Sequence, residues 1–137
     1  MIATTSLLAL DRAFRTAWAA DTCSPDDVAR EPWRPDNPAW GHCDITALAV
    51  HDLFGGDLML AKVELDGADV GHHWWNRLPS GLELDLTYEQ FRLGQRLFDA
   101  GPVVRPTGPL KRRAAEYHLL RERLAGALGR ELPPAGN

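Results

Sequence analysis

The amino-acid sequence predicts a single α+β domain in which N-terminal helices pack on a small antiparallel sheet. Three observations lead to this fold class. Helical periodicity near both ends of the chain flanks three consecutive strand-like segments. Short segments of turn-forming residues join those strands, and they are too short for the crossovers of a parallel sheet. The 137 residues suit one domain, and 45% hydrophobic with 25% charged residues is a globular composition.

Composition and charge restrict the class of protein further. We expect one domain over 1–137, with a globular core over 5–128 and a flexible tail over 129–137. A formal net charge of −4 argues against a nucleic-acid partner. The sequence has neither an apolar run of membrane-spanning length nor a basic leader, so we expect no membrane association and a cytoplasmic location. Two cysteines are too few for a disulfide scaffold, and no cofactor is expected.

The N-terminal half predicts two helices separated by a long loop. Residues 5–20 are expected to form an amphipathic helix, because apolar residues recur at three- and four-residue spacing. That stripe consists of Leu7, Leu10, Phe14, Ala17 and Trp18. Segment 21–42 contains four prolines within fourteen residues and is expected to be irregular. A second helix is predicted over 43–54, and the Gly-Gly pair that follows would end it.

The C-terminal half predicts three strands and two helices. The strands are Leu58–Leu65, Gly71–Leu78 and Leu82–Thr87, separated by turn signals at Asp66-Gly67 and Pro79-Ser80-Gly81. A short helix is expected over 88–98, followed by a loop with glycine and prolines. The last helix is expected over 110–128.

Cys43 is the candidate nucleophile. It lies in the first turn of the helix predicted over 43–54, two residues after Gly41. The free N–H groups and partial positive charge of a helix N-terminus favour a thiolate and lower the pKa of a cysteine. The same N–H groups donate to the oxyanion that forms on an attacked carbonyl. The alternative is that Cys43 is a small buried hydrophobic residue, which is the more common environment of a free cysteine.

His73 and Asp85 form the candidate base. A three-residue hairpin loop at 79–81 sets His73 opposite Thr87, which makes His73 and Asp85 diagonal neighbours on one face of the sheet. A carboxylate held against one imidazole nitrogen leaves the other nitrogen free to accept a proton from a thiol. A two-residue loop would instead favour His72. The alternative is a surface His–Asp pair without a catalytic role.

The order of Cys43, His73 and Asp85 resembles that of transglutaminase and papain-like thiol enzymes. Over Leu7 to Arg123 the chain more closely resembles the YunG family of small uncharacterised bacterial proteins. The segments that carry this resemblance are Asp21-Thr22-Cys23, Asn37-Pro38-Ala39, Gly41-His42-Cys43, Thr46-Ala47-Leu48, Asp52-Leu53-Phe54-Gly55-Gly56, His73-Trp74-Trp75-Asn76, Asp85-Leu86-Thr87 and Gln90-Phe91. The resemblance implies that the three candidate residues fall where the family shares residues, within a papain- or transglutaminase-like core.

The chain departs from the family pattern directly before the cysteine. That pattern has glutamine at the position of His42. If the amide helps to bind an oxyanion, the His42 imidazole replaces it as a donor only in part. Asp44, directly after the cysteine, suits a helix start but opposes formation of the thiolate.

The leading hypothesis is a cysteine-dependent enzyme that acts on an acyl or amide bond by hydrolysis, deamidation or transfer. Cys43 attacks, His73 accepts and returns the proton, and Asp85 orients His73. The substrate is a small molecule or a peptide. Residues expected to bind substrate or to stabilise the oxyanion are His42, Trp40, Trp75 and Asn76. The tryptophans at these spacings are also typical of a hydrophobic core.

Two other classes of function stay open. Cys43, His73 and Asp85 suit a zinc site by residue type, although no paired metal-ligand spacing is present. The fold also suits a non-catalytic module that binds a carrier or partner protein, which would show an inert Cys43 in a filled cleft. Cys23 is interpreted as a packed residue or a second, resolving thiol. The basic run 111–113 is interpreted as a solvated helix start.

Overall fold

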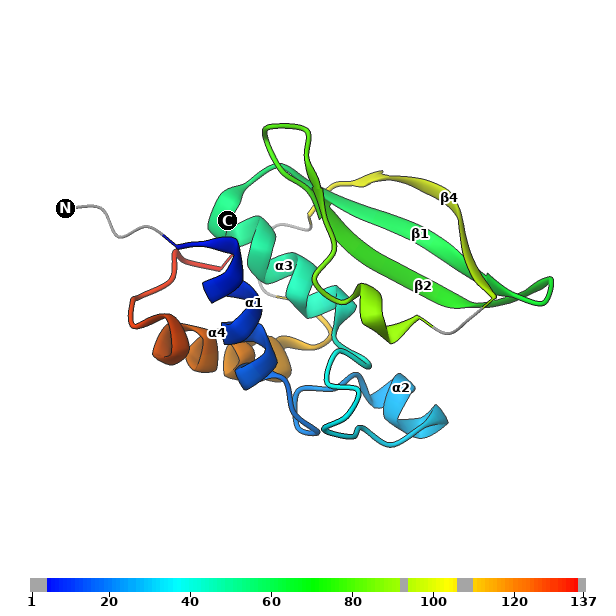
Figure 1. Cartoon of the computed structure of the whole chain (residues 1–137), viewed down its shortest axis with the longest axis horizontal. Coiled ribbons are helices and arrows are strands. Elements are labelled where there is room, and N and C mark those ends of the chain that lie inside the picture. The colour runs from blue at the N-terminus through cyan, green and yellow to red at the C-terminus, as the bar shows by residue number, and fades with distance from the viewer. Residues whose placement is uncertain (1–4, 92–93, 106–109, 136–137) are drawn as a thin grey trace.

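The α+β class with an antiparallel sheet is confirmed by the computed structural model of the chain, which describes residues 5–91, 94–105 and 110–135 (Figure 1). The elements in chain order are α1 (Leu7–Ala17), α2 (Pro25–Arg30), α3 (Cys43–Phe54), β1 (Asp57–Leu65), β2 (Ala68–Arg77), β3 (Glu83–Leu84), the 3-10 turn η1 (Tyr88–Gln90), β4 (Gln95–Val103) and α4 (Ala114–Leu128). None of these helices is both long and apolar enough to cross a membrane.

The sheet is built around a long hairpin of β1 and β2. Its strand order is β3-β2-β1-β4, and every pair is antiparallel. Asp66 and Gly67 form the two-residue turn of the hairpin and both have positive φ, 54° and 81°, as a type I′ turn requires. Both predicted turn signals are confirmed, since Leu78 N–H also donates to Leu82 O across a three-residue loop.

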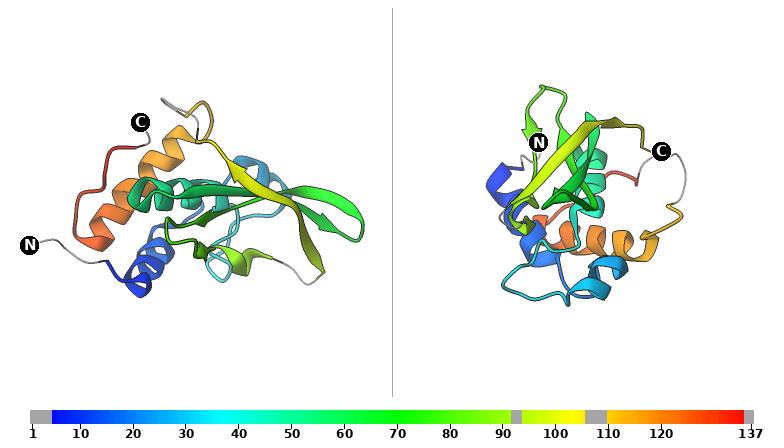
Figure 2. Two further views of the ribbon diagram at one scale, coloured as in Figure 1. Left: turned by 90° about the horizontal axis from the view of Figure 1, so that it is seen from above. Right: turned by 90° about the vertical axis from the view of Figure 1, so that its right-hand side faces the viewer.

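The hydrophobic core lies between the helices and one end of the sheet. Helices α1 and α4 pack together, and α3 lies between them and the sheet, while the hairpin turn projects beyond the helices (Figures 1 and 2). The apolar stripe of α1 supplies Leu10, Phe14 and Ala17 to this core. A smaller cluster of Met59, Ala61 and Trp75 packs on the opposite face of the sheet.

The first helix is shorter than predicted, and the loop that follows contains a helix that was not predicted. Ser6 caps α1 through a hydrogen bond from Ala9 N–H to its Oγ, and the helix ends at Ala17. Leu7, expected in the apolar stripe, is instead exposed. The loop predicted over 21–42 contains α2, because Pro25 suits a first helical position even though it disfavours a helix interior.

The prediction was wrong for 88–98, where a helix was expected. The described residues of this segment form the turn η1 and the start of β4, an edge strand paired with β1, and residues 92 and 93 lie outside the described residues. β4 is irregular, with Pro102, a positive φ at Asp99 and a bulge in its pairing. Its sequence therefore does not show the regular apolar alternation by which a strand is recognised. The predicted strand Leu82–Thr87 is also too long, since β3 is limited to Glu83–Leu84.

A buried ion cluster joins α3 to α4. Asp52 has only 2% of its side chain exposed and lies 3.1 Å from Arg105 Nε and 3.5 Å from Arg121 Nη1. Tyr117 Oη also donates a hydrogen bond to Asp52. Burial, followed by this hydrogen bond to a carboxylate, raises the pKa of Tyr117. The Asp52 carboxylate therefore interacts with two arginines from different parts of the chain.

Candidate functional site

Cys43 is the first residue of α3, as predicted, and it is half-buried. Two consecutive turns lead into the helix. In the first turn Trp40 N–H donates to Asn37 O, and in the second His42 N–H donates to Ala39 O. Gly41 then adopts a φ of +75°, a conformation that residues with a side chain rarely adopt. This sharp change of direction places the thiol on the side of α3 that faces β2.

We expect Gly41→Ala to lower the free energy of unfolding by more than about 1 kcal/mol, the usual penalty for a left-handed residue with a Cβ. An added Cβ at this position would lie only 2.3 Å from Cys23 Sγ, so steric overlap adds to the backbone strain. Urea unfolding tests this expectation. Gly126→Ala is the control, because Gly126 lies within α4 with open space around it. This substitution should stabilise the chain by about 0.5–1 kcal/mol. Equal effects of the two substitutions would contradict the argument.

The sulfur of Cys43 lies at the open edge of β2. Leu78 N–H points toward the β3 side, and alternate residues of a strand direct their N–H groups to the same edge, so Trp74 N–H points there too. Because β3 ends at Leu84, no strand residue occupies the position beside Trp74. Cys43 takes this position, where the backbone of Trp74 and the side chain of Gln90 both act to lower the pKa of its thiol.

The thiol of Cys43 is protonated at neutral pH. Burial is the main cause that raises its pKa to about 12. The charges of Asp44 and, more weakly, Asp27 act in the same direction, whereas the Trp74 backbone and the Gln90 side chain act to lower the pKa. The expectation of a lowered pKa at the helix N-terminus was therefore wrong, because removal from water outweighs the helix dipole. Any reaction at this sulfur requires a base or a change in the surrounding charge.

His73 and Asp85 come together as the predicted hairpin register requires. His73 Nε2 donates to Asp85 Oδ2 at 2.6 Å, and the imidazole is fully buried. The ring is fixed from both sides, stacked on Trp75 at 5.7 Å and met by the edge of Phe91 at 4.4 Å between ring centroids. The alternative register that favoured His72 is excluded by the three-residue loop.

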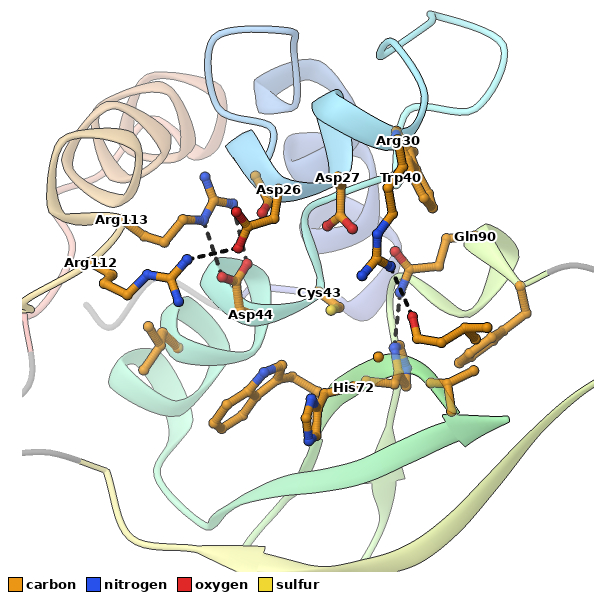
Figure 3. Close-up of a pocket in the computed structure, with 18 of the residues that line it drawn as sticks. Asp26, Asp27, Arg30, Trp40, Cys43, Asp44, His72, Gln90, Arg112 and Arg113 are labelled. Atoms are coloured by element: carbon orange, nitrogen blue, oxygen red, sulfur yellow. Dashed lines mark hydrogen bonds and ion pairs between the residues drawn. The ribbon is translucent and has the colours of Figure 1, made fainter. Parts of the chain in front are cut away.

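Gln90 connects Cys43 to His73. Its side-chain amide nitrogen donates to His73 Nδ1 at 2.9 Å (Figure 3). The same side chain also lies near enough to the Cys43 thiol to lower its pKa. Gln90 thus lies between Cys43 and the hydrogen-bonded pair of His73 and Asp85, with no direct hydrogen bond between the thiol and the imidazole. Sequence reasoning did not assign a role to Gln90, because the position of its side chain depends on η1 turning back toward β2.

His42 does not take part in the site as expected. Its imidazole is fully buried, Nδ1 donates to Trp40 O at 2.8 Å and Nε2 accepts from Thr22 Oγ1 at 2.8 Å. Both ring nitrogens are therefore occupied by protein groups, and neither is available to an oxyanion. The side chain instead holds the turn before α3 against Trp18, whose ring centroid lies 5.8 Å away.

We expect His42 to make stability fall in mild acid. Burial lowers the pKa of His42 to about 4, whereas an unfolded histidine has a pKa of about 6.5. The unfolded chain therefore binds the proton first, and the stabilisation present above pH 6.5 is lost as the pH falls through 4, by up to about 3 kcal/mol. Urea unfolding between pH 7 and 4 measures this loss. His42→Gln should remove most of this slope, and an unchanged slope would contradict the assignment.

Of the other residues expected to bind substrate, only Trp40 lines the pocket beside Cys43. Trp75 lies on the opposite face of the sheet and donates from Nε1 to Glu83 Oε1 at 2.8 Å. Asn76 is buried beneath α3 and donates to Ala47 O at 2.9 Å. Trp75 and Asn76 therefore support the sheet and its contact with α3, and neither lines this pocket.

A pocket of about 1160 Å³ opens beside the thiol. Elements α2, α3, β2 and η1 and the segment before α4 contribute to its walls, and Cys43 lies at its centre (Figure 3). The walls combine apolar side chains, such as Trp40, Leu48 and Trp74, with charged groups from α2. Asp27 and Arg30, which sequence reasoning did not identify, both line this pocket.

Arg113 anchors the start of α3 and is not a solvated residue. Its guanidinium donates to Asp44, to Gly41 O at 3.0 Å and to Thr22 O at 2.9 Å, with 8% of the side chain exposed. These contacts connect the segment before α4 to the turn that precedes Cys43. The interpretation of 111–113 as a solvated helix start is therefore wrong for this residue, whereas Arg112 is largely exposed.

Cys23 is a packed residue. Its buried thiol donates to Trp40 O at 3.2 Å, and burial raises its pKa to about 11. Both Cys23 and Cys43 are free, so no disulfide connects them. In the described ranges, no three His, Cys, Asp or Glu side chains are placed to hold a metal ion together, so Cys43, His73 and Asp85 do not form a zinc site.

Sequence comparison identifies the family to which this α+β chain belongs. Residues 6–129 match the family described as "YunG protein", and the chain belongs to that family. A curated relative, "Uncharacterized protein YunG" of Bacillus subtilis (strain 168), is 35% identical over 60 residues. That match covers 44% of this chain and 47% of the relative, so it spans less than half of either protein. No solved structure matches the chain.

Proposed function

We propose that this chain is a cysteine-dependent enzyme that acts on an acyl or amide bond of a small molecule or peptide. The observation that carries the proposal is the hydrogen-bonded series Gln90–His73–Asp85 beside Cys43, at the wall of an open pocket that Cys43, His73 and Gln90 all line. A thiol at a helix start, with histidine and aspartate on the strands that follow, is also the order in transglutaminase and papain-like enzymes.

In the first step, His73 Nδ1 accepts the proton of Cys43 while the sulfur attacks the carbonyl carbon. Asp85 stabilises the resulting imidazolium through Nε2–H. The tetrahedral intermediate then expels an amine or alcohol, which takes the proton from Nδ1 and leaves a thioester on Cys43. Water completes hydrolysis or deamidation, and an amine or alcohol acceptor completes transfer.

Gln90 has two consecutive roles in this scheme. Its amide blocks Nδ1 in the resting state, so it rotates away from the imidazole when substrate enters. The freed N–H group is then available to the oxygen of the attacked carbonyl, together with Trp74 N–H at the open edge of β2. Gln90 and Trp74 thereby replace His42 as the proposed oxyanion donors.

The open volume of the pocket favours an enzyme over a binding module without catalytic activity. Such a module is expected to fill the cleft with side chains, whereas here the space beside Cys43 is about 1160 Å³. That volume is enough for a drug-sized molecule or a short peptide segment. The apolar wall formed by Trp40, Leu48 and Trp74 suits the carbon skeleton of such a substrate.

A panel of activated esters and amides tests the proposal. We expect turnover by the wild-type chain, with an acyl group of the correct mass on the peptide that contains Cys43. Cys43→Ala should abolish both signals. Cys23→Ser, which alters the other thiol, should retain them because Cys23 is packed away from the pocket. Equal turnover by Cys43→Ala, or an acyl group on Cys23, would overturn the proposal.

A further inference from the structure

Asp27 faces the candidate nucleophile from the opposite wall of the pocket. It lies on α2, and its carboxylate points into the pocket toward Cys43 (Figure 3). The two groups are close enough for the charge of Asp27 to raise the pKa of the Cys43 thiol. While the pocket is empty, a carboxylate in this position works against the proposed attack by Cys43, because its negative charge opposes formation of the thiolate.

The carboxylate of Asp27 has no hydrogen bond or ion pair with any residue that the structure describes. Each neighbouring arginine is engaged elsewhere. Arg30 donates to Val70 O at 2.8 Å, Arg112 pairs with Asp26 at 2.8 Å, and Arg113 pairs with Asp44 at 3.1 Å. Burial, followed by the opposing charge effects of Arg30 and Asp44, leaves the pKa of Asp27 raised. A half-buried carboxylate without a close partner is a site for a cation.

We propose that Asp27 binds a positively charged group of the substrate, a primary ammonium or a guanidinium, and holds it beside the thiol of Cys43. This inference rests on the proposed function and narrows its substrate to cationic acyl or amide compounds. The apolar side chains of Trp40 and Trp74 line the same pocket and suit the carbon chain between the cation and the reacting bond.

The bound cation also activates the nucleophile. It neutralises the charge of Asp27, the weakest of the three effects that raise the pKa of the Cys43 thiol. The other carboxylate that raises the pKa of the thiol, Asp44, is already paired with Arg113 at 3.1 Å. The thiol therefore loses its proton to His73 more readily when the correct substrate is in place, and it stays protonated in the empty pocket.

Methanethiosulfonate reagents of similar size but different charge test this inference without a known substrate. The Cys43 thiolate attacks the reagent sulfur, a mixed disulfide forms and methanesulfinate leaves. We compare aminoethyl, neutral alkyl and anionic sulfonatoethyl reagents at pH 8, and quantify the modified peptide that contains Cys43. Asp27→Asn is the test variant. Asp26→Asn is the matched control, because Asp26 lines the same pocket on α2 but is exposed and pairs with Arg112.

We expect Asp27→Asn to lower the cation-to-anion ratio of rate constants by about tenfold, the effect of about 1.4 kcal/mol of lost attraction, and Asp26→Asn to lower it less than about twofold. Added propylammonium should also accelerate the neutral reagent on the wild-type chain, a measurement that needs no variant. Equal ratios in both variants, or no acceleration by propylammonium, would overturn the subsite. The ester panel with Cys43→Ala tests the proposed function separately. Ester turnover that depends on Cys43, combined with equal cation-to-anion ratios in the two aspartate variants, would reject the cation subsite and leave the proposed function standing.

Discussion

Replacing His73 with alanine is expected to slow acylation of Cys43 by about 10²–10⁴-fold, the usual contribution of a positioned general base. The expectation follows from the buried imidazole, which Asp85 holds at 2.6 Å and whose Nδ1 faces Cys43 through Gln90. Free imidazole should restore part of the rate in His73→Ala. A residue with only a structural role would not give this rescue.

The neighbouring histidine supplies the control. His72 also lines the pocket and is exposed. Its side chain lies on the other face of β2 from that of His73, because neighbouring residues of a strand alternate. His72→Ala should change the acylation rate less than about threefold, well below the effect of a lost base. Circular dichroism and urea unfolding establish that both variants fold, with His73→Asn as a substitute if the alanine variant does not. Equal losses at the two positions would contradict the assignment of the base.

Replacing Asp52 with alanine is expected to lower the free energy of unfolding by about 3–5 kcal/mol, the range for removing one partner of a buried ion pair. The substitution leaves Arg105 and Arg121, with 8% and 15% of their side chains exposed, without their shared carboxylate. It also removes the acceptor of the Tyr117 hydroxyl. The midpoint and slope of urea unfolding measure the loss.

Asp57 provides an exposed ion pair for comparison. It pairs with Arg77 at 2.8 Å, and about half of the aspartate side chain and 39% of the arginine side chain are exposed. Asp57→Ala should therefore cost no more than about 1 kcal/mol. A loss at Asp52 as small as the loss at Asp57 would show that the cluster beneath α3 does not contribute the stability expected from its burial.

Local signals in the sequence were sufficient to predict the parts of the site that are set by residues close together along the chain. Gly41 and the apolar pattern after it place the start of α3 at Cys43. The three residues at 79–81 form the predicted loop, and the register of β2 and β3 then brings His73 to Asp85. Turn length and side-chain alternation are properties of short segments, so they can be evaluated without the rest of the fold.

The remaining features depend on how distant segments pack. β4 was missed because an edge strand with proline and charged residues has no apolar alternation. Gln90 reaches both Cys43 and His73 only because β3 ends early and η1 turns back across the open edge of β2. His42 was assigned to the oxyanion from its place beside the cysteine, whereas its ring is buried in the turn before α3.

By itself, the sequence determined the α+β class, the position of Cys43 at a helix start and the pairing of His73 with Asp85. The tertiary structure decided the ionisation state of the thiol, the link through Gln90 and the presence of Asp27 across the pocket. The physical reason is that hydrogen bonding within a turn or hairpin is a local property. Burial and electrostatic interaction instead depend on every segment that the fold brings near a group, however distant that segment is along the chain.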